Sequence, residues 1–134
     1  KEEAILVFPE GSRGISKPNS KKYQLERFGN GFMRMALDNN TPIIPIGMVG
    51  FEESMIRIGE IKPLAKMFKL SVFPILAPIL LPTKVIINIG EPMYFKQDGH
   101  TPEYLLDEKV NKVKAEINKL IKKGLSQRTS LFEK

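Results

Sequence analysis

The chain has 134 residues, 42% of them hydrophobic, which is the size of one domain able to bury a single modest core. Lysine and arginine number 21 against 15 aspartate and glutamate, so the formal net charge of +6 favours anionic partners such as phosphorylated metabolites, lipid headgroups or nucleic acid. The sequence contains no cysteine, which excludes a disulfide framework and a thiolate metal site.

The first half of the chain alternates apolar runs with turn residues. Residues 4–8 are apolar and rich in strand formers, and residues 9–14 form a turn cluster, so we expect a strand and then a tight loop. Apolar residues at helical spacing over 28–36 predict a short amphipathic helix. Residues 43–49 predict a buried strand with an irregularity at Pro45. Strand, helix and strand in this order predict a βαβ unit and a parallel sheet.

The middle of the chain contains a charge-free stretch at residues 70–83, interrupted by three prolines. It is shorter than the ~20 apolar residues of a spanning helix, so an ordinary transmembrane helix is not expected. Residues 85–89 predict a third strand, which ends at Gly90 and Pro92.

The last part of the chain predicts a helix that starts at Thr101 and Pro102 and stops at Gly124. One apolar stripe, with lysines largely off it, indicates that the helix covers the sheet and exposes a solvated outer face. The stripe consists of Val110, Val113, Ile117, Leu120 and Ile121. We expect one domain over residues 1–125 and a frayed tail over 126–134.

The loop after the first predicted strand combines a carboxylate, Glu10, with a guanidinium, Arg13, beside Gly11 and Gly14. Arginine can hold a phosphate through two parallel hydrogen bonds, and glycines let a ligand approach the backbone. Glu10 would accept a hydrogen bond from a substrate hydroxyl or hold Arg13 in place. The alternative is a strand-ending turn with a surface ion pair.

The sequence of this loop, Phe-Pro-Glu-Gly-Ser-Arg-Gly at residues 8–14, closely resembles the Phe-Pro-Glu-Gly-Thr-Arg-Ser block of the lysophospholipid and glycerol-phosphate acyltransferases. Serine replaces threonine, and glycine replaces the last serine. Residues 28–37, 41–47 and 89–92 resemble further blocks of that family in the same order. The resemblance therefore covers about residues 4–92, and several ordered blocks are more specific than one motif.

The resemblance implies an α/β fold with a mostly parallel sheet and flanking helices, present here as the incomplete C-terminal part of a glycerolipid acyltransferase domain. It implies that Glu10, Gly11, Ser12 and Arg13 bind the glycerol or glycerol-phosphate acceptor. Pro45 would shape the wall of the site, and a sheet-edge kink is an equal alternative for it. The implied donor is acyl-coenzyme A or acyl carrier protein, with no cofactor and no metal.

The main departure from the family is that its catalytic His-x-x-x-x-Asp pair cannot be assigned. The pair stands well upstream of the loop in the family, whereas only seven residues precede Phe8 here. His100 is followed five positions later by Leu105, so it fails the pattern and is interpreted as a solvated turn residue. We therefore expect a piece of a longer enzyme, with no catalytic residue of its own and inactive alone.

The apolar stretch at 70–82 follows Lys62, Lys66 and Lys69, and it is either core or a surface that meets anionic lipid. Its sequence is similar to a segment found in the monoacylglycerol acyltransferase-like branch of the superfamily. The expected location is the cytoplasmic face of a membrane. A non-catalytic lipid-phosphate or membrane-binding module is the second hypothesis, a nucleic-acid partner is not expected, and self-association through an exposed sheet edge stays open.

Overall fold

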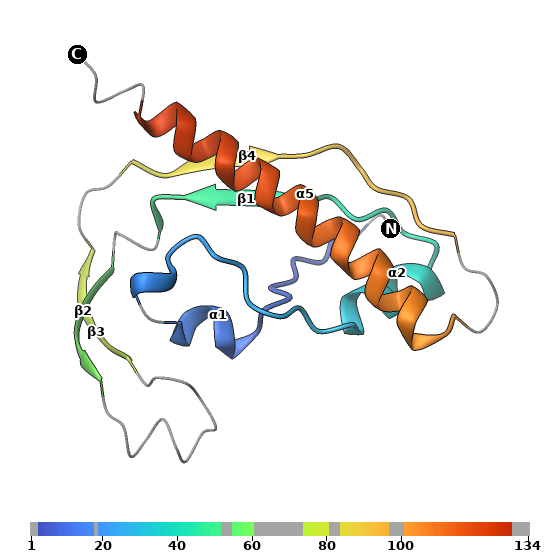
Figure 1. The fold of residues 1–134 in the computed structure, drawn as a ribbon, viewed down its shortest axis with the longest axis horizontal. Helices are drawn as coiled ribbons and strands as arrows, with labels where there is room; N and C mark the ends of the chain where they lie inside the picture. Colours follow the sequence, from blue (N-terminus) through green and yellow to red (C-terminus); the bar gives the residue numbers. More distant parts are fainter. Residues whose placement is uncertain are drawn as a thin grey trace.

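The computed structural model describes residues 3–17, 19–51, 55–60, 74–80, 84–96 and 101–129. Within them the helices are α1 (Ser12–Ser16), the 3-10 turn η1 (Asn19–Lys21), α2 (Gly31–Asp38) and α5 (Glu103–Thr129). The strands are β1 (Ile46–Val49), β2 (Met55–Glu60), β3 (Pro74–Leu80) and β4 (Ile86–Ile89). Figure 1 shows α5 running along the β1–β4 ribbon, with β2 and β3 beyond one end of it.

The predicted α/β fold with a mostly parallel sheet is wrong, because both described sheets are antiparallel pairs. In the β1–β4 ribbon Ile46 lies opposite Ile89 and Val49 opposite Ile86, and β2 pairs with β3 in the same antiparallel sense. A parallel pair needs a crossover connection, usually a helix. The connection from β1 to β4 instead contains the β2–β3 pair, and β4 returns in the direction opposite to β1 (Figure 1).

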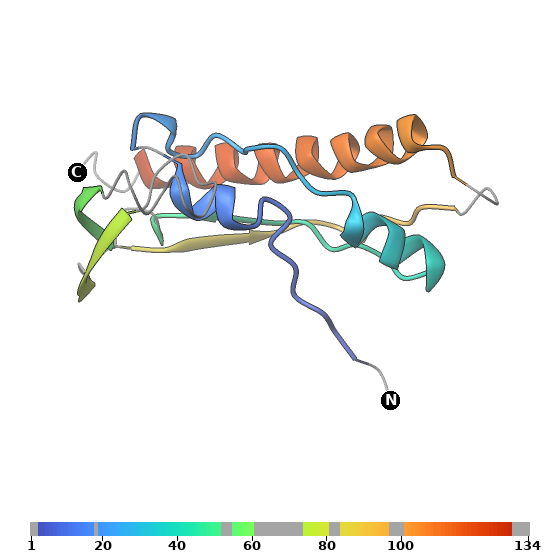
Figure 2. The ribbon, with the colours of Figure 1, turned by 90° about the horizontal axis from the view of Figure 1, so that it is seen from below.

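The strand predicted at residues 4–8 is also wrong, since this segment has no strand partner among the described residues. Ile5, Leu6 and Phe8 are 72%, 71% and 65% exposed. Figure 2 shows the segment extending away from the β1–β4 ribbon on the side opposite α5. Strand-forming residues become a strand only where a neighbouring strand pairs with their backbone groups. The βαβ prediction fails for this reason.

The β1–β4 ribbon has one covered and one bare face. Gly47 and Val49 are buried beneath α5, whereas Ile46 and Met48 point the other way and are exposed. The alternation follows from the period of two in a strand. The amide of Asn88 in β4 donates a hydrogen bond to the Leu120 carbonyl of α5 at 3.0 Å, which ties the helix to the ribbon.

Two glycines let the backbones of α5 and the ribbon approach closely. A Cβ atom at Gly47 would lie 2.6 Å from Leu120 Cβ and 2.9 Å from the Ile121 nitrogen. A Cβ atom at Gly124 would lie 2.8 Å from Val49 Cγ2. Distances this short exclude a side chain without a shift of the surroundings, so glycine sets the separation of helix and ribbon.

The predicted end of the helix at Gly124 is wrong, because α5 continues to Thr129 and includes the start of the 126–134 segment. Gly124 is a contact glycine and not a helix stop. The predicted start is confirmed, since the Pro102 carbonyl accepts the first backbone hydrogen bonds. The Thr101 hydroxyl, predicted as the cap, has no hydrogen-bond partner among the described residues.

The predicted apolar stripe of α5 is confirmed, because four of its residues are buried and Ile117 packs partly against the core. On the exposed side Lys112 pairs with Glu108 at 2.9 Å. The hydrogen bond from Lys112 and then its positive charge hold the pKa of Glu108 below its ordinary value. Lys112, Lys119, Lys122 and Lys123 thus belong to a solvated face, whereas Lys109 and Lys114 are partly buried.

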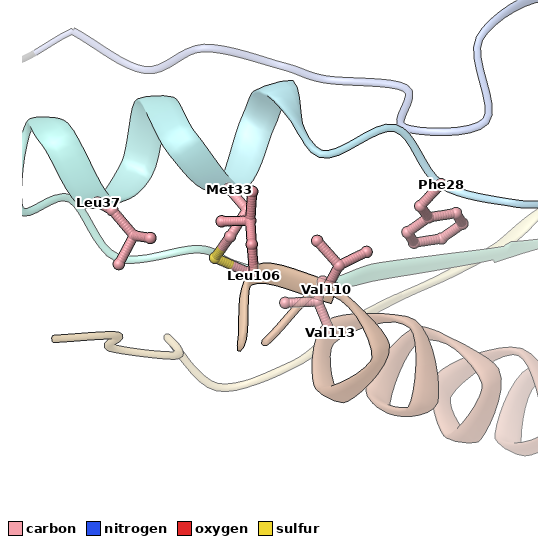
Figure 3. Packing of buried hydrophobic residues seen from close by; sticks show 6 residues of the cluster. All are labelled: Phe28, Met33, Leu37, Leu106, Val110 and Val113. Atoms are coloured by element: carbon pink, nitrogen blue, oxygen red, sulfur yellow. The ribbon is translucent and has the colours of Figure 1, made fainter. Parts of the chain in front are cut away.

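The core forms where α2 meets α5 (Figure 3). Its buried members are Phe28, Met33, Leu37, Leu106, Val110 and Val113. The helix predicted over 28–36 is present with shifted bounds, and its buried side is Met33 and Leu37, whereas the predicted Met35 is exposed. The Asn30 amide donates to the Asp107 carboxylate at 2.8 Å and joins the start of α2 to α5.

We predict that Gly47→Ala lowers the free energy of unfolding by about 1 to 3 kcal/mol, the usual cost of overpacking. Gly31→Ala is the matched control, because a Cβ atom there meets nothing within 4 Å. Urea denaturation followed by circular dichroism measures both changes. Equal midpoints for the two variants would contradict the close contact between α5 and β1.

Candidate functional site

Residues 8–11 form a tight turn that leads into α1, and Ser12, Arg13 and Gly14 are the first residues of that helix, so the sequence predicted the turn but not the helix. The Gly11 amide donates to the Phe8 carbonyl at 3.0 Å, and the Gly14 amide donates to the Gly11 carbonyl at 3.2 Å. Gly11 has φ +58°, in the left-handed region that favours glycine. The Gly29 amide donates to the Pro9 carbonyl at 2.9 Å and fastens the loop to the segment before α2.

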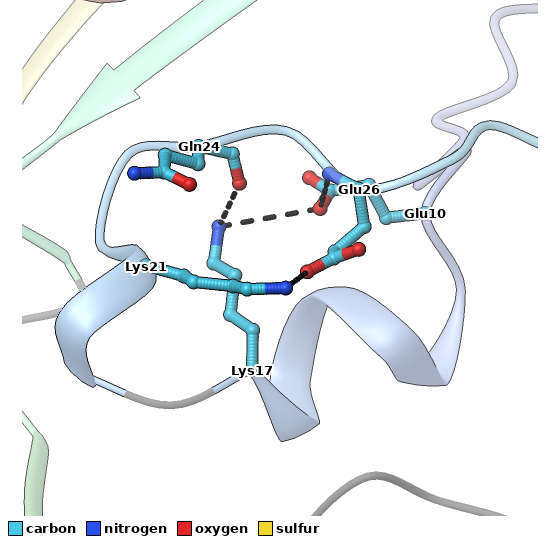
Figure 4. A network of polar contacts seen from close by, with 5 residues as sticks. All are labelled: Glu10, Lys17, Lys21, Gln24 and Glu26. Carbon is cyan, nitrogen blue, oxygen red and sulfur yellow. Dashed lines mark hydrogen bonds and ion pairs between the residues drawn. The ribbon is translucent and has the colours of Figure 1, made fainter.

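The Glu10 carboxylate turns inward from this loop (Figure 4). Its Oε2 atom accepts the backbone N–H of Glu26 at 2.9 Å and lies 4.0 Å from the Lys17 ammonium. The side chain passes over Gly14, where an added Cβ atom would come within 3.1 Å of Glu10 Cβ. Glu10 therefore links the loop to the segment before α2, through contacts distant in sequence.

Lys17 is the second member of this polar cluster and is only 6% exposed. Its Nζ atom donates to the Gln24 carbonyl at 3.1 Å and faces the Glu10 carboxylate (Figure 4). A buried ammonium is costly unless hydrogen bonds and an opposite charge surround it. Sequence reasoning missed Lys17, because it lies among polar residues and resembles its neighbours Lys21 and Lys22 in type.

The remaining predicted loop residues, Gly11, Ser12 and Arg13, lie on the exposed side of the turn. A guanidinium, a hydroxyl and an accessible glycine backbone are groups that bind an oxyanion. Their role as acceptor ligands stays a prediction. The turn brings these three together and separates their exposed positions from the half-buried Glu10 carboxylate.

Pro45, the fifth predicted site residue, is buried within the ribbon. It stands between the Ile43–Met93 bridge and the start of β1, and its carbonyl accepts the Gly90 amide at 2.8 Å. Proline cannot donate to a strand ladder, so it interrupts the pairing there. This position fits the kink that the sequence left open as an alternative, and a wall-forming role stays a prediction.

A depression of about 520 Å³ lies between residues 25–30 and α5. Its lining includes Glu26 and Asp107 as well as Arg27 and Lys114, and the Lys114 ammonium stands 5.5 Å from the centre of the Phe28 ring. Because both signs of charge occur in its wall, the depression does not favour one sign of ligand charge.

The bare face of the β1–β4 ribbon is apolar. Ile46 pairs across the strands with Ile89, and Met48 with Ile87, and all four side chains are exposed. The apolar segment 5–8 extends on the same side of the ribbon (Figure 2). Contiguous apolar surface of this kind marks an interaction site in a soluble protein.

Other predicted features are placed only in part. His100 and residues 61–73 and 81–83 lie outside the described residues, as do Lys62, Lys66 and Lys69. Among the described residues, no cluster of three acidic or histidine side chains could hold a metal ion. No helix in that same part of the chain combines the length and apolar composition needed to cross a bilayer.

The chain is similar to mycobacterial proteins described only as uncharacterized. Relatives from Mycobacterium tuberculosis and Mycobacterium bovis are 34% identical over 144 aligned positions, which cover 97% of this chain and 40% of the relative. A relative from Mycobacterium leprae is 38% identical over 102 positions, covering 69% of this chain and 28% of the relative. The chain thus spans less than half the length of these relatives. No protein-family model matches it, and no solved structure gives a significant match.

Proposed function

We propose that this chain is the acceptor-binding part of a glycerolipid acyltransferase. The enzyme would move a fatty acyl group from acyl-coenzyme A or acyl carrier protein to a hydroxyl of glycerol phosphate, a lysophospholipid or a related glycerolipid. The observation that carries the proposal is the hydrogen-bonded turn and start of α1 at residues 8–14, which exposes Gly11, Ser12 and Arg13. The resemblance of this turn and the following blocks to the acyltransferases supplies the chemistry.

In the proposed site Arg13 binds the phosphate of the acceptor through two guanidinium N–H groups. Gly11 has no side chain, so the phosphate can approach the backbone, and the Ser12 hydroxyl adds a hydrogen bond. The acceptor hydroxyl oxygen attacks the thioester carbon, the carbon–sulfur bond breaks, and the thiol leaves. A histidine base would take the hydroxyl proton. In the family that the loop resembles, this base belongs to the His-x-x-x-x-Asp block, which the present sequence does not contain.

The bare apolar surface supports the proposal that a further polypeptide region completes the enzyme. Ile5, Leu6, Ile87 and Ile89 are exposed apolar side chains, and their burial against further polypeptide would be favourable. The match covers 40% of the relatives' length, so these proteins are longer than the present chain. We propose that a region bearing the histidine block covers this surface in the complete enzyme.

A non-catalytic lipid-phosphate or membrane-binding module is the second candidate. The exposed loop alone would be enough for a module that binds a phosphate without catalysis. His100 does not supply the catalytic pair, because Leu105 and not aspartate stands five positions after it. The two candidates differ in whether the complete native protein transfers an acyl group to glycerol 3-phosphate. Radiolabelled acyl-coenzyme A provides the assay, and phosphate-acceptor binding without any transfer would favour the module.

We predict that Arg13→Ala in the complete protein weakens use of glycerol 3-phosphate by about 1.5 to 3 kcal/mol, the usual value of a hydrogen bond to a charged group. The measured quantity is kcat/KM for the acceptor. Arg34→Ala, which removes an exposed arginine of α2, is the matched control. With a neutral monoacylglycerol acceptor the effect of Arg13→Ala should be small. Unchanged kinetics with both acceptors would remove Arg13 from the site.

We also propose that the protein acts at a membrane surface, because a lysophospholipid or glycerolipid acceptor lies in the membrane and the net charge is +6. The β3 strand, Pro-Ile-Leu-Ala-Pro-Ile-Leu, carries no charge and is the part of the 70–82 stretch that the structure describes. It pairs with β2 beyond the end of the β1–β4 ribbon (Figure 1). This position leaves the strand apart from the α2–α5 core.

We predict that Ile75→Ser combined with Ile79→Ser lowers binding to vesicles at least tenfold. An isoleucine side chain that inserts into the lipid contributes about 1.5 to 3 kcal/mol to the binding free energy. Cosedimentation of the complete protein with phosphatidylglycerol-containing vesicles measures the loss. Tyr104→Ser removes an exposed aromatic of α5 and should leave binding unchanged. Retained binding of the double variant would show that β3 does not meet the lipid.

A further inference from the structure

We infer that Lys17 is a positioning residue for the anion-binding loop, an inference that rests on the proposed function of residues 8–14. Lys17 and the Glu26 backbone hold the Glu10 carboxylate on the inner side of the loop. The outer side then presents Ser12 and Arg13 to a phosphate-bearing acceptor. We call the set of Glu10, Lys17 and the backbone of Gln24 and Glu26 the inner clamp.

The inner clamp joins three segments that local structure alone would not hold together. Glu10 comes from the turn, Lys17 follows the end of α1, and Gln24 and Glu26 belong to the segment that leads to α2. The contacts are Lys17 Nζ to the Gln24 carbonyl at 3.1 Å, Glu26 N to Glu10 Oε2 at 2.9 Å, and Lys17 Nζ to Glu10 Oε2 at 4.0 Å. Figure 4 shows them converging on one side of the loop.

The burial of Lys17 distinguishes this contact from an ordinary surface ion pair. Lys21 and Glu26 pair at 3.4 Å nearby, but the Lys21 side chain is 53% exposed and such a pair contributes little. Lys17 is 6% exposed and the Glu10 side chain 17%. When one partner of a buried pair is removed, the other charge remains desolvated and uncompensated. The Glu10 carboxylate would then turn outward to reach water.

An outward carboxylate would harm phosphate binding in two ways. It would release the turn from the Glu26 amide, so the backbone of Gly11 and Ser12 would lose its fixed position. It would also place a negative charge beside Arg13, which opposes an anionic ligand. The inner clamp thus assigns Glu10 to the support of the loop, whose outer side carries Ser12 and Arg13.

Isothermal titration of the complete native protein with glycerol 3-phosphate tests the inference. We expect Lys17→Met, which keeps the apolar stem but removes the ammonium, to raise the Kd at least tenfold. Lys22→Met, an exposed lysine of the same stretch, is the control and should leave the Kd within about twofold. In the Glu10→Gln background, Lys17→Met should change the Kd less than about threefold, because no buried carboxylate is left unpaired.

The titration separates positioning from a general loss of structure. Partial unfolding lowers the number of sites per chain, whereas a misplaced loop raises the Kd of the protein that remains folded. An unchanged Kd for Lys17→Met, or an equal loss in the Glu10→Gln background, would overturn the role of Lys17. If Lys17→Met does not fold, the test is the comparison of the Kd of Glu10→Gln with that of the double variant. A change of less than about threefold supports the role of Lys17, and a larger change overturns it. Wild-type protein that binds no glycerol 3-phosphate would instead refute the proposed function of the loop.

Discussion

The close approach of α5 to the β1–β4 ribbon is the constraint on which the other contacts depend. Gly47 and Gly124 leave no room for a Cβ atom between helix and ribbon, so the backbones themselves meet. With the helix fixed there, its earlier turns present Leu106 and Val110 to α2 and build the α2–α5 core. The segment before α2 in turn holds the candidate loop, through the Gly29 amide on one side and the Glu26 amide on the other. The position of an exposed turn is thus determined by a helix–ribbon contact formed by other parts of the chain.

The same packing explains why the molecule keeps an apolar surface. A single helix can cover one face of a two-stranded ribbon, and the period of two sends every second side chain to the other face. Ile46, Met48, Ile87 and Ile89 form that face. A domain of this size buries a small fraction of its surface and gains little stability from its own core. The bare apolar face is therefore consistent with the proposal that a further polypeptide region packs against this chain.

Local patterns in the sequence predicted the features that depend on neighbours along the chain. The tight turn before α1, the start of α5 and its apolar stripe follow from the turn residues, the position of Pro102 and the helical period. Strand direction does not follow from such patterns, because it depends on the path between strands, so the parallel sheet was wrong. The βαβ prediction was wrong because residues 4–8 have no strand partner among the described residues. Gly124 was misassigned because the missing Cβ atom suits both a helix end and a close contact. Lys17 was missed because burial of one lysine among several depends on partners distant in sequence.

If the loop binds an anion as proposed, its own carboxylate opposes that binding electrostatically, and the geometry of the inner clamp reduces this opposition. Glu10 and Arg13 carry opposite charges, which together would leave little positive potential for a phosphate. Lys17 matches the charge of Glu10 on the buried side, where weak screening strengthens the attraction. Arg13 lies on the exposed side, next to a turn that the same carboxylate ties to the Glu26 amide. In the proposed site the carboxylate thereby supports anion binding through its position, although its charge opposes it.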